Sequence, residues 1–288
     1  MTDNILLQLD VDAQPSTFDG VVAVDAGADQ LFRHGGISVE NVTGLVHGLM
    51  FTRGGDALKH SAIFIGGGDV VAAEAVLHQV QKTFFGPVRV SVLFDANGCN
   101  TTAAAAVVTA MEQVDLAASR ALVLGGTGPV GRRAAAMLLA KGAAVSLASR
   151  QLSRAREACE QIMGDDEEVR SRLKPVADES LEAAMDTAEV VIACGAAGVE
   201  LLGQNELERM SNLKVAIDLN AVPPAGVAGI GPMDKAVSLP HGVGYGAIAV
   251  GGLKMKVHKA TIRRLFEAND AVLDVAEVFE IAESLSTA

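Results

Sequence analysis

Aromatic residues are scarce in this chain of 288 residues, which has no tryptophan, one tyrosine (Tyr245) and nine phenylalanines. Half of the residues are nonetheless hydrophobic, so the chain is far too apolar to be disordered and its core must be built from Ala, Val, Leu and Ile. With so few aromatic side chains, a flat ring bound here must be held mainly by hydrogen bonds and aliphatic side chains.

Cysteine and long apolar runs are scarce as well. Cys99, Cys159 and Cys194 are widely separated and form no C-x-x-C pair, which gives no support to a disulfide framework or a zinc site. The first residues are polar and acidic, unlike a signal peptide, and no run of about 18 apolar residues could span a membrane. We therefore predict a cytoplasmic protein without membrane contact.

Positive charge is also in deficit, since 23 Lys and Arg face 35 Asp and Glu for a net charge of −12. A surface of this sign repels phosphate, which argues against a nucleic-acid partner. The sequence contains no G-x-S-x-G elbow, P-loop or H-E-x-x-H motif, and its six histidines lack metal-ligand spacing. Hydrolysis by a catalytic triad, phosphoryl transfer and zinc chemistry therefore have no candidate residues.

Short β-branched runs alternate with longer Ala-rich stretches, which is typical of βαβ units and a mainly parallel sheet. Strands are predicted at 5–9, 62–65, 88–94, 121–124, 144–148, 190–193 and 215–219, and helices at 39–51, 69–84, 101–114, 130–141, 152–163 and 255–284. We read 164–168 as a loop and 221–246 as an irregular connection. The predicted fold is α/β with two domains: an α/β domain over 1–110, rejoined by 256–288, and a Rossmann-like domain over 111–255.

A glycine fingerprint lies at the start of the second domain. Its G-x-G-x-x-G pattern comprises Gly126, Thr127, Gly128, Pro129, Val130 and Gly131. The pattern alone is weak in a chain with 30 glycines, but an apolar strand precedes it and a helix follows, as dinucleotide binding requires. Such glycines allow a tight turn, approach of a pyrophosphate and close helix–strand packing. The alternative is a purely structural turn.

The residues after the next strand indicate which dinucleotide is bound. NAD-binding proteins place a carboxylate about 20 residues beyond the fingerprint, whereas here Ser149 and Arg150 occupy that place and Arg154 follows. A hydroxyl beside guanidinium groups suits a 2′-phosphate, so we predict NADP as the cofactor. The alternative is that these arginines are ordinary solvated residues at a helix start.

Further cofactor contacts are predicted at two later strand ends. The small residues Cys194, Gly195 and Ala196 follow one strand, and Asn220 follows the next. Small side chains at the carboxyl end of a strand leave room for a nicotinamide or ribose. Both segments are also compatible with plain turns.

A basic cluster stands out in this acidic protein, because 254–264 holds five cations and no carboxylate. Lys254 and Lys256 follow Gly251 and Gly252, where a helix N-terminus is expected, and cations there oppose the helix dipole. A local anion or a polar substrate would explain them; the alternative is a solvated face. Polar side chains also follow a first-domain strand, including Asn97 and Thr102, which suit either a helix cap or recognition of a heterocycle.

Over essentially its whole length the sequence resembles the NADP-dependent methylene-tetrahydromethanopterin dehydrogenases of bacterial one-carbon metabolism, including the form that also accepts methylene-tetrahydrofolate. The resemblance rests on several blocks in the same order: 14–19 (QPSTFD), 52–55 (TRGG), 64–69 (FIGGGD), 97–105 (NGCNTTAAA), 126–131 (GTGPVG), 220–224 (NAVPP) and 251–258 (GGLKMKVH). It implies a pterin-binding first domain, a Rossmann domain for NADP and a homo-oligomer, a trimer or hexamer.

The resemblance also implies transfer of a hydride from the methylene carbon to nicotinamide, with no obligatory general base. The family's substrate-contacting residues match Asn97, Thr102, Lys254 and Lys256, with Asp19 as a further candidate, and Lys256 is the residue we expect to matter most for catalysis. Two alternatives stay open. A folate-specific dehydrogenase–cyclohydrolase would have a Tyr-x-x-x-Lys pair, but here Tyr245 is followed by Ala249. A non-catalytic NADP sensor would need no second-substrate site.

Overall fold

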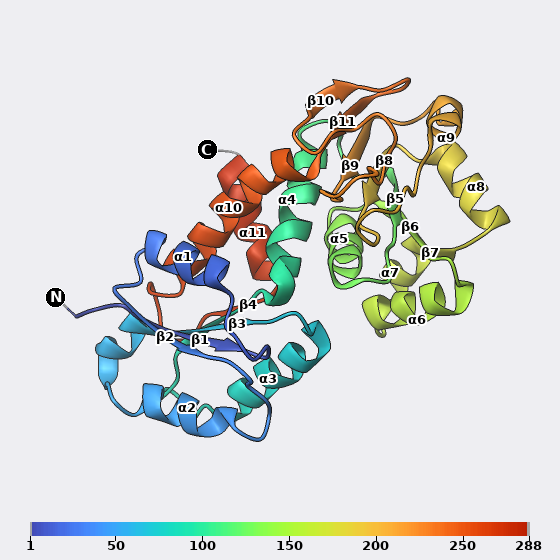
Figure 1. Cartoon of the computed structure of the whole chain (residues 1–288). Coiled ribbons are helices and arrows are strands. Elements are labelled where there is room, and N and C mark those ends of the chain that lie inside the picture. Colours follow the sequence, from blue (N-terminus) through green and yellow to red (C-terminus); the bar gives the residue numbers. More distant parts are fainter. Residues whose placement is uncertain (1, 287–288) are drawn as a thin grey trace. The chain divides into compact units, whose positions relative to one another are not determined.

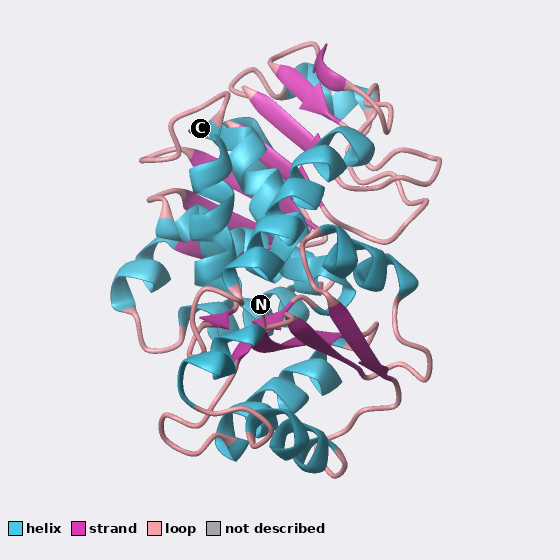
Figure 2. Cartoon of the chain, turned by 90° about the vertical axis from the view of Figure 1, so that its left-hand side faces the viewer, coloured by secondary structure: helices cyan, strands magenta, loops and turns pink. Residues whose placement is uncertain are grey.

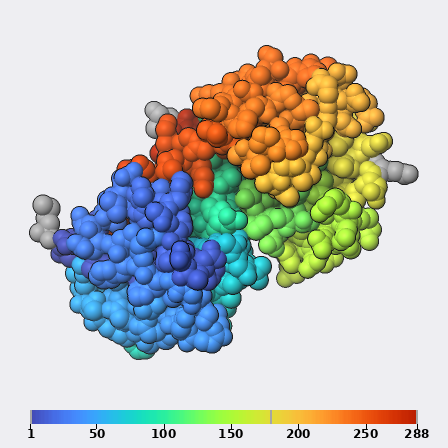
Figure 3. All heavy atoms as spheres, in the orientation of Figure 1, coloured from blue at the N-terminus to red at the C-terminus, as the bar shows by residue number. Residues whose placement is uncertain are grey.

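The computed structural model describes residues 2–286 and divides the chain into two compact units. The first contains residues up to Thr101 together with the segment from Met255, and the second contains Thr102–Lys254. The sequence places this first boundary near residue 110, later than the contacts do. The C-terminal segment, at the red end of the colour scale in Figure 3, rejoins the N-terminal unit. Within this unit Lys259 pairs with Asp25 at 2.8 Å.

The first unit is a parallel sheet in the order β12-β4-β3-β1-β2 with helices on both faces (Figures 1 and 2). Its strands are β1 (Ile5–Asp10), β2 (Gln30–His34), β3 (Ser61–Gly66), β4 (Ser91–Phe94) and β12 (Val272–Leu273). Its helices are α1 (Thr17–Asp25), α2 (Val42–Met50), α3 (Val70–Thr83) and α11 (Val275–Ser286), with 3-10 turns at Gly55–His60 and Ala96–Gly98. The central strands β3 and β4 are buried on both faces, as their continuous apolar runs require.

Two long helices cross the unit boundary along the chain. They are α4 (Cys99–Met111) and α10 (Ala247–Arg264). In the first unit the sheet order has the form 2-1-3-4-5, whose direction of winding reverses between β1 and β3. Ligands of open α/β sheets bind beyond the carboxyl ends of the strands at such a reversal. We therefore expect a ligand site near the residues that follow β1 and β3.

The second unit has the doubly wound order of a Rossmann fold, β10-β11-β9-β8-β5-β6-β7. Its strands are β5 (Arg120–Leu124), β6 (Ala144–Ala148), β7 (Leu173–Val176), β8 (Val190–Ala193), β9 (Val215–Asp218), β10 (Lys235–Ser238) and β11 (Val243–Tyr245), of which β10 alone is antiparallel to its neighbour. Its helices are α5 (Pro129–Ala140), α6 (Leu152–Met163), α7 (Glu167–Arg172), α8 (Glu179–Thr187) and α9 (Gln204–Arg209). The winding reverses between β5 and β8.

The predicted α/β class is confirmed, and the strands at 190–193 and 144–148 have the predicted bounds. Four local predictions are wrong. The 164–168 loop contains the start of α7, which Asp166 caps by accepting from the backbone N–H of Glu168 and Val169. The connection 221–246 contains β10 and β11. Gly251 and Gly252 lie inside α10 rather than before it. The helix predicted at 255–284 is interrupted, because α10 ends at Arg264 and β12 precedes α11.

Candidate active site

The loop after β5 makes a tight turn against the loop after β8. Gly125 has a φ of +68°, and a Cβ built on it would lie 2.5 Å from the Cα of Gly195. A Cβ on Gly126 would lie 2.6 Å from Leu147 Cγ, and one on Gly131 would lie 2.6 Å from the Cα of Gly126. The left-handed turn therefore falls on Gly125, one residue before the fingerprint, whereas Gly126 and Gly131 provide close packing between strand and helix.

Gly128 differs from these glycines. Its φ is −74°, which any residue adopts, and the nearest atom to a Cβ built on it, Gly125 O, is 3.7 Å away. Neither backbone strain nor a neighbouring protein atom therefore requires glycine here. Gly128 is the N-cap of α5, and Pro129 is the first residue of that helix. The free backbone N–H groups of the first helical turn follow. This glycine-lined helix start fits a pyrophosphate, which would occupy the space that a side chain would fill.

The end of β6 lies beside this loop, because Gly126 N donates to Ala148 O at 3.0 Å. Ser149 follows, with its hydroxyl accepting weakly from Gln151 N at 3.4 Å. Arg150 and Arg154 are exposed, and among the described residues neither guanidinium has an ion-pair partner. No carboxylate occupies the position after β6, so this strand end offers a hydroxyl and free cations to an anion.

The carboxyl ends of β8 and β9 lie at the same edge of the second unit's sheet as the ends of β5 and β6. Cys194 donates its S–H to Leu124 O at 3.2 Å, and burial raises the pKa of its thiol to about 12. The Cys194 sulfur also lies 2.9 Å from a Cβ built on Gly131, so it packs behind the fingerprint as an unreactive thiol. Asn220 is 9% exposed, with its amide hydrogen-bonded to neighbouring backbone, whereas Ala196 is exposed.

In the first unit, carboxylates gather where the sheet reverses. Asp10, at the end of β1, is buried and accepts from the backbone N–H of Asp12 and Ser16, both at 3.0 Å. Asp12 in turn accepts from Gly68 N at 2.9 Å. Gly67 has a φ of +117°, and a Cβ on it would lie 2.3 Å from Val11. The loops after β1 and β3 are therefore held in contact at the reversal.

Asp19 lies at this same edge. It is in the first turn of α1, whose N-cap Ser16 accepts from its backbone N–H at 3.2 Å. The Asp19 carboxylate is 4.0 Å from Nε2 of His258 and 16% exposed. The His258 ring is buried and stacks on Phe64 with the centroids 5.7 Å apart. The predicted residue Asp19 thus faces a histidine that sequence reasoning did not select.

Asn97 also lies at the carboxyl edge of this sheet, in the segment that follows β4. It is exposed and has a φ of +53°, a left-handed conformation that asparagine tolerates better than most residues. The buried carboxylate of Asp95 holds the segment by accepting from Asn100 N, Thr101 N and the Thr101 hydroxyl at 2.6–3.0 Å. A strained residue on a rigid support is a frequent feature of ligand sites. Thr102 lies half-buried in the first turn of α4.

The structure places Lys254 and Lys256 in the middle of α10, and Lys256 is exposed. Residues two apart on a helix point in different directions, so the two lysines do not share one face, whereas Lys254 and His258 do. Because α10 begins at Ala247, the argument from an unfavourable helix dipole at Lys254 and Lys256 was wrong. The last cations of the cluster, Arg263 and Arg264, lie in the final turn, where the dipole favours them.

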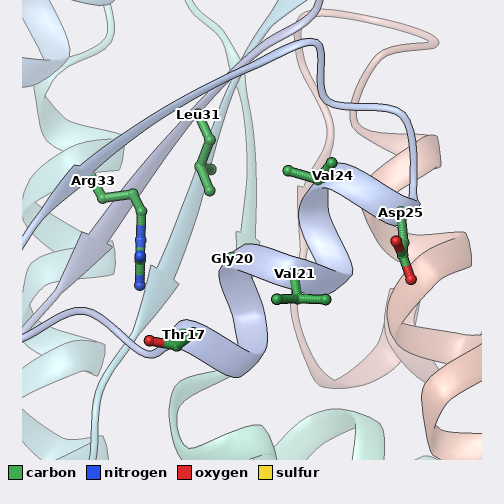
Figure 4. A pocket seen from close by; sticks show the side chains of 7 residues that line it. All are labelled: Thr17, Gly20, Val21, Val24, Asp25, Leu31 and Arg33. Atoms are coloured by element: carbon green, nitrogen blue, oxygen red, sulfur yellow. The ribbon is translucent and has the colours of Figure 1, made fainter.

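A shallow depression of about 320 Å³ lies between α1 and β2 (Figure 4). It is lined by Thr17, Gly20, Val21, Val24, Asp25, Leu31 and Arg33. Arg33 is engaged by Gln8 Oε1 at 3.0 Å and Pro15 O at 2.7 Å. This mainly apolar depression contains none of the predicted substrate residues.

Two residues of these edges, Gly125 and His258, were not selected as site residues from the sequence, whereas Asp95 and Asp218 were recognised there only as polar residues at strand ends. A signal existed for Gly125, because it extends the glycine run by one residue.

Within the part of the chain that the structure describes, no group of three or more His, Cys, Asp or Glu side chains could hold a metal ion. No described helix is long and apolar enough to cross a membrane.

Similarity to solved structures supports the fold. The ligand-free 5-ketofructose reductase of Gluconobacter sp. strain CHM43 has a TM-score of 0.54 at 14% identity, covering 98% of this chain and 99% of that one. Quinate dehydrogenase from Corynebacterium glutamicum in complex with NAD has a TM-score of 0.52 at 16% identity, with the same coverage. At such identities the likeness shows the fold alone.

Similarity in sequence identifies a family as well as a fold. Residues 17–97 match the family described as methylene-tetrahydromethanopterin dehydrogenase, N-terminal, and 108–234 match shikimate/quinate 5-dehydrogenase. The bifunctional protein MdtA of Methylorubrum extorquens is 40% identical, covering 99% of this chain and 100% of the relative. An NAD(P)-dependent methylenetetrahydromethanopterin dehydrogenase of the same organism is 32% identical with the same coverage. This full-length similarity confirms the resemblance drawn from the sequence blocks, and the chain belongs to the methylene-tetrahydromethanopterin dehydrogenase family.

Proposed function

We propose that this protein is an oxidoreductase that transfers a hydride from methylene-tetrahydromethanopterin to NADP. The observation that carries the proposal is the dinucleotide loop at the reversal of the second unit's sheet, in a chain whose full-length relative is named a methylenetetrahydromethanopterin dehydrogenase. In this reaction a C–H bond of the methylene carbon breaks and its electron pair moves with the hydrogen to C4 of the nicotinamide. The products are the methenyl cation and NADPH.

The residues present suit this chemistry. The two pterin nitrogens that flank the reacting carbon stabilise the methenyl cation, so no proton has to be removed and no base is needed. The protein's contribution is to hold donor and acceptor carbons in near-attack geometry. In this proposal Asp19 and Asn97, at the carboxyl edge of the first unit's sheet, bind the pterin together with Thr102 of α4.

Lysines 254 and 256 have separate tasks in this proposal. An ammonium next to the forming cation would oppose its formation, so Lys256 binds a pterin oxygen or nitrogen at a distance from the reacting carbon and fixes the ring's orientation. Lys254 lies four residues before His258 on α10 and therefore shares its helix face; in this proposal it provides a second positive charge for the polar edge of the pterin.

We further propose that NADP is preferred to NAD. Ser149, Arg150 and Arg154 at the end of β6 provide a hydroxyl and two positive charges for the 2′-phosphate. Arg150→Ala should raise the KM for NADP far more than the KM for NAD, and replacing the exposed Arg209 of α9 in the same way should change neither. Equal effects of Arg150→Ala on both cofactors would refute this assignment.

An absorbance assay for NADPH with each pterin tests the function as a whole. We expect turnover with methylene-tetrahydromethanopterin, with methylene-tetrahydrofolate as a second substrate. Binding of NADP without turnover on either pterin would favour a sensor instead. We also propose a homo-oligomer, for which light scattering of the purified protein is the direct measurement.

A further inference from the structure

A buried carboxylate organises the segment that follows β9. Asp218, the last residue of that strand, is 1% exposed. Its two oxygens accept backbone N–H bonds from Asn220 at 2.9 Å, Gly226 at 2.7 Å and Val227 at 3.1 Å. Burial raises the pKa of Asp218 above the usual range, while these three bonds act in the opposite direction. The carboxylate therefore folds 219–227 back onto the end of its own strand.

Asn220 extends this arrangement to the neighbouring loop. Its Oδ1 accepts from Val222 N at 3.0 Å and from Gly198 N at 3.3 Å, while its Nδ2 donates to Pro224 O at 2.8 Å. Gly198 belongs to the loop that follows β8, so one amide side chain joins the two loops. We call Asp218 and Asn220 the β9 brace.

The main chain reinforces the brace. Gly226 O accepts from the backbone N–H of Leu201 at 2.8 Å and of Leu202 at 3.1 Å. Leu201 in turn packs on Gly195, where a built Cβ would lie 2.7 Å from its Cδ1, and Gly195 meets the dinucleotide loop at Gly125. A continuous set of contacts thus leads from Asp218 to the loop that would hold the pyrophosphate.

The brace stands where the redox half of the cofactor has to lie. With the pyrophosphate at the start of α5, the nicotinamide half extends along the carboxyl ends of the neighbouring strands, which here are β8 and β9. The loops held by the brace form that edge. Asp218 itself is too deeply buried to touch a ligand, since all three of its contacts are backbone N–H groups of its own loop.

We propose that Asp218 is a positioning residue for the nicotinamide, which it aligns by fixing the loops after β8 and β9 through Asn220 without touching the cofactor. This inference rests on the proposed dehydrogenase function. It assigns Asn220 to the support of the site rather than to direct cofactor binding. Because hydride transfer depends on near-attack geometry, a shift of the ring by about 1 Å costs on the order of a hundredfold in rate.

The test is Asp218→Asn, which keeps the size of the side chain but turns one acceptor into a donor that faces backbone N–H groups. We expect its affinity for 2′-phospho-ADP-ribose, which has every part of NADP except the nicotinamide, to stay within about twofold of wild type. Affinity for NADP should fall several-fold, and kcat should fall by about tenfold to a hundredfold. Hydrogen exchange at the amides of Gly226 and Val227 should accelerate.

Two further variants keep the test decisive. Gly226→Ala perturbs the brace from the other side, because its Cβ would lie 2.6 Å from Asp218 Oδ1, and it should reproduce the same pattern even if Asp218→Asn fails to fold. Asp234→Asn is the matched control. Asp234 also accepts a hydrogen bond from a backbone N–H, that of Gly231 at 2.7 Å, but it lies outside the brace. This variant should therefore keep the wild-type kcat and the wild-type affinity for NADP.

The inference is overturned if NADP and 2′-phospho-ADP-ribose lose affinity together, or if both brace variants keep wild-type kcat and NADP affinity. Failure of the proposed function gives a different result. In that case the wild type turns over neither pterin, while the comparison of the two ligands still reports whether the brace positions the nicotinamide.

Discussion

Gly128 and Gly131 belong to the same fingerprint, yet the structure predicts that alanine at each position has a different effect. Gly128→Ala places a methyl group where no protein atom lies within 3.7 Å and where φ is −74°. The free energy of unfolding should therefore change by less than about 1 kcal/mol, since the poorer N-cap is offset by a less flexible unfolded chain. The methyl group does occupy the space assigned to the pyrophosphate.

The loss of cofactor binding can be estimated from the contact that the methyl group blocks. A hydrogen bond between a backbone N–H and a charged phosphate contributes about 1.5–3 kcal/mol. Displacing the pyrophosphate from one such bond should weaken NADP binding by about tenfold to a hundredfold. Gly131→Ala should instead destabilise the fold by about 1–3 kcal/mol, because its Cβ would lie 2.6 Å from Gly126 Cα and 2.9 Å from the Cys194 sulfur.

Calorimetric titration with NADP and thermal unfolding of the free protein separate the two effects. Gly128→Ala should keep the wild-type Tm and lose affinity, whereas Gly131→Ala should lose several degrees of Tm. Wild-type affinity in Gly128→Ala would refute the placement of the pyrophosphate at the start of α5. A large fall in its Tm would refute the interpretation that this glycine serves the ligand rather than the fold.

Three further predictions concern single side chains. Lys256→Ala should lower turnover strongly and leave the Kd for NADP unchanged; normal turnover would remove Lys256 from the site. The hydrogen bond from Lys214 at 2.6 Å lowers the pKa of Glu189, so its stabilisation is present above the unfolded-state pKa and is lost as pH falls through the folded-state pKa. Glu189→Gln should therefore reduce the free energy of unfolding in urea by up to about 1 kcal/mol at pH 7, and by progressively less as the pH is lowered through the folded-state pKa; a reduction that does not change with pH would contradict this. With a thiol pKa of about 12, the partly buried Cys194 should react only slowly with iodoacetamide at about pH 8 until the protein unfolds, and rapid labelling of the folded protein would contradict the raised pKa.

Much of the fold is predictable from the sequence because the apolar runs of buried parallel strands are local signals. The elements that were missed lack such a signal. Strand β2 (Gln30–His34) is a largely exposed edge strand with polar residues, and its identity depends on pairing with β1. The start of α10 was mistaken because two adjacent glycines favour a break, although the helix continues through Gly251 and Gly252.

The cofactor loop was predictable because its glycines occur at a fixed spacing between a strand and a helix. The other site contacts join residues that are far apart along the chain. Asp19 meets His258 only because α10 returns to the first unit, and no local pattern announces that pairing. The role of Asp218 depends on the bonds it makes with a loop whose conformation the sequence does not reveal.

The most direct test of this account is a spectroscopic assay that mixes the purified protein with NADP and methylene-tetrahydromethanopterin and, separately, with methylene-tetrahydrofolate. The account predicts that NADPH and the methenyl product form at the same rate, and that this rate is much higher than the rate of NADH formation when NAD replaces NADP. A protein that binds NADP but forms no NADPH with either pterin would contradict it.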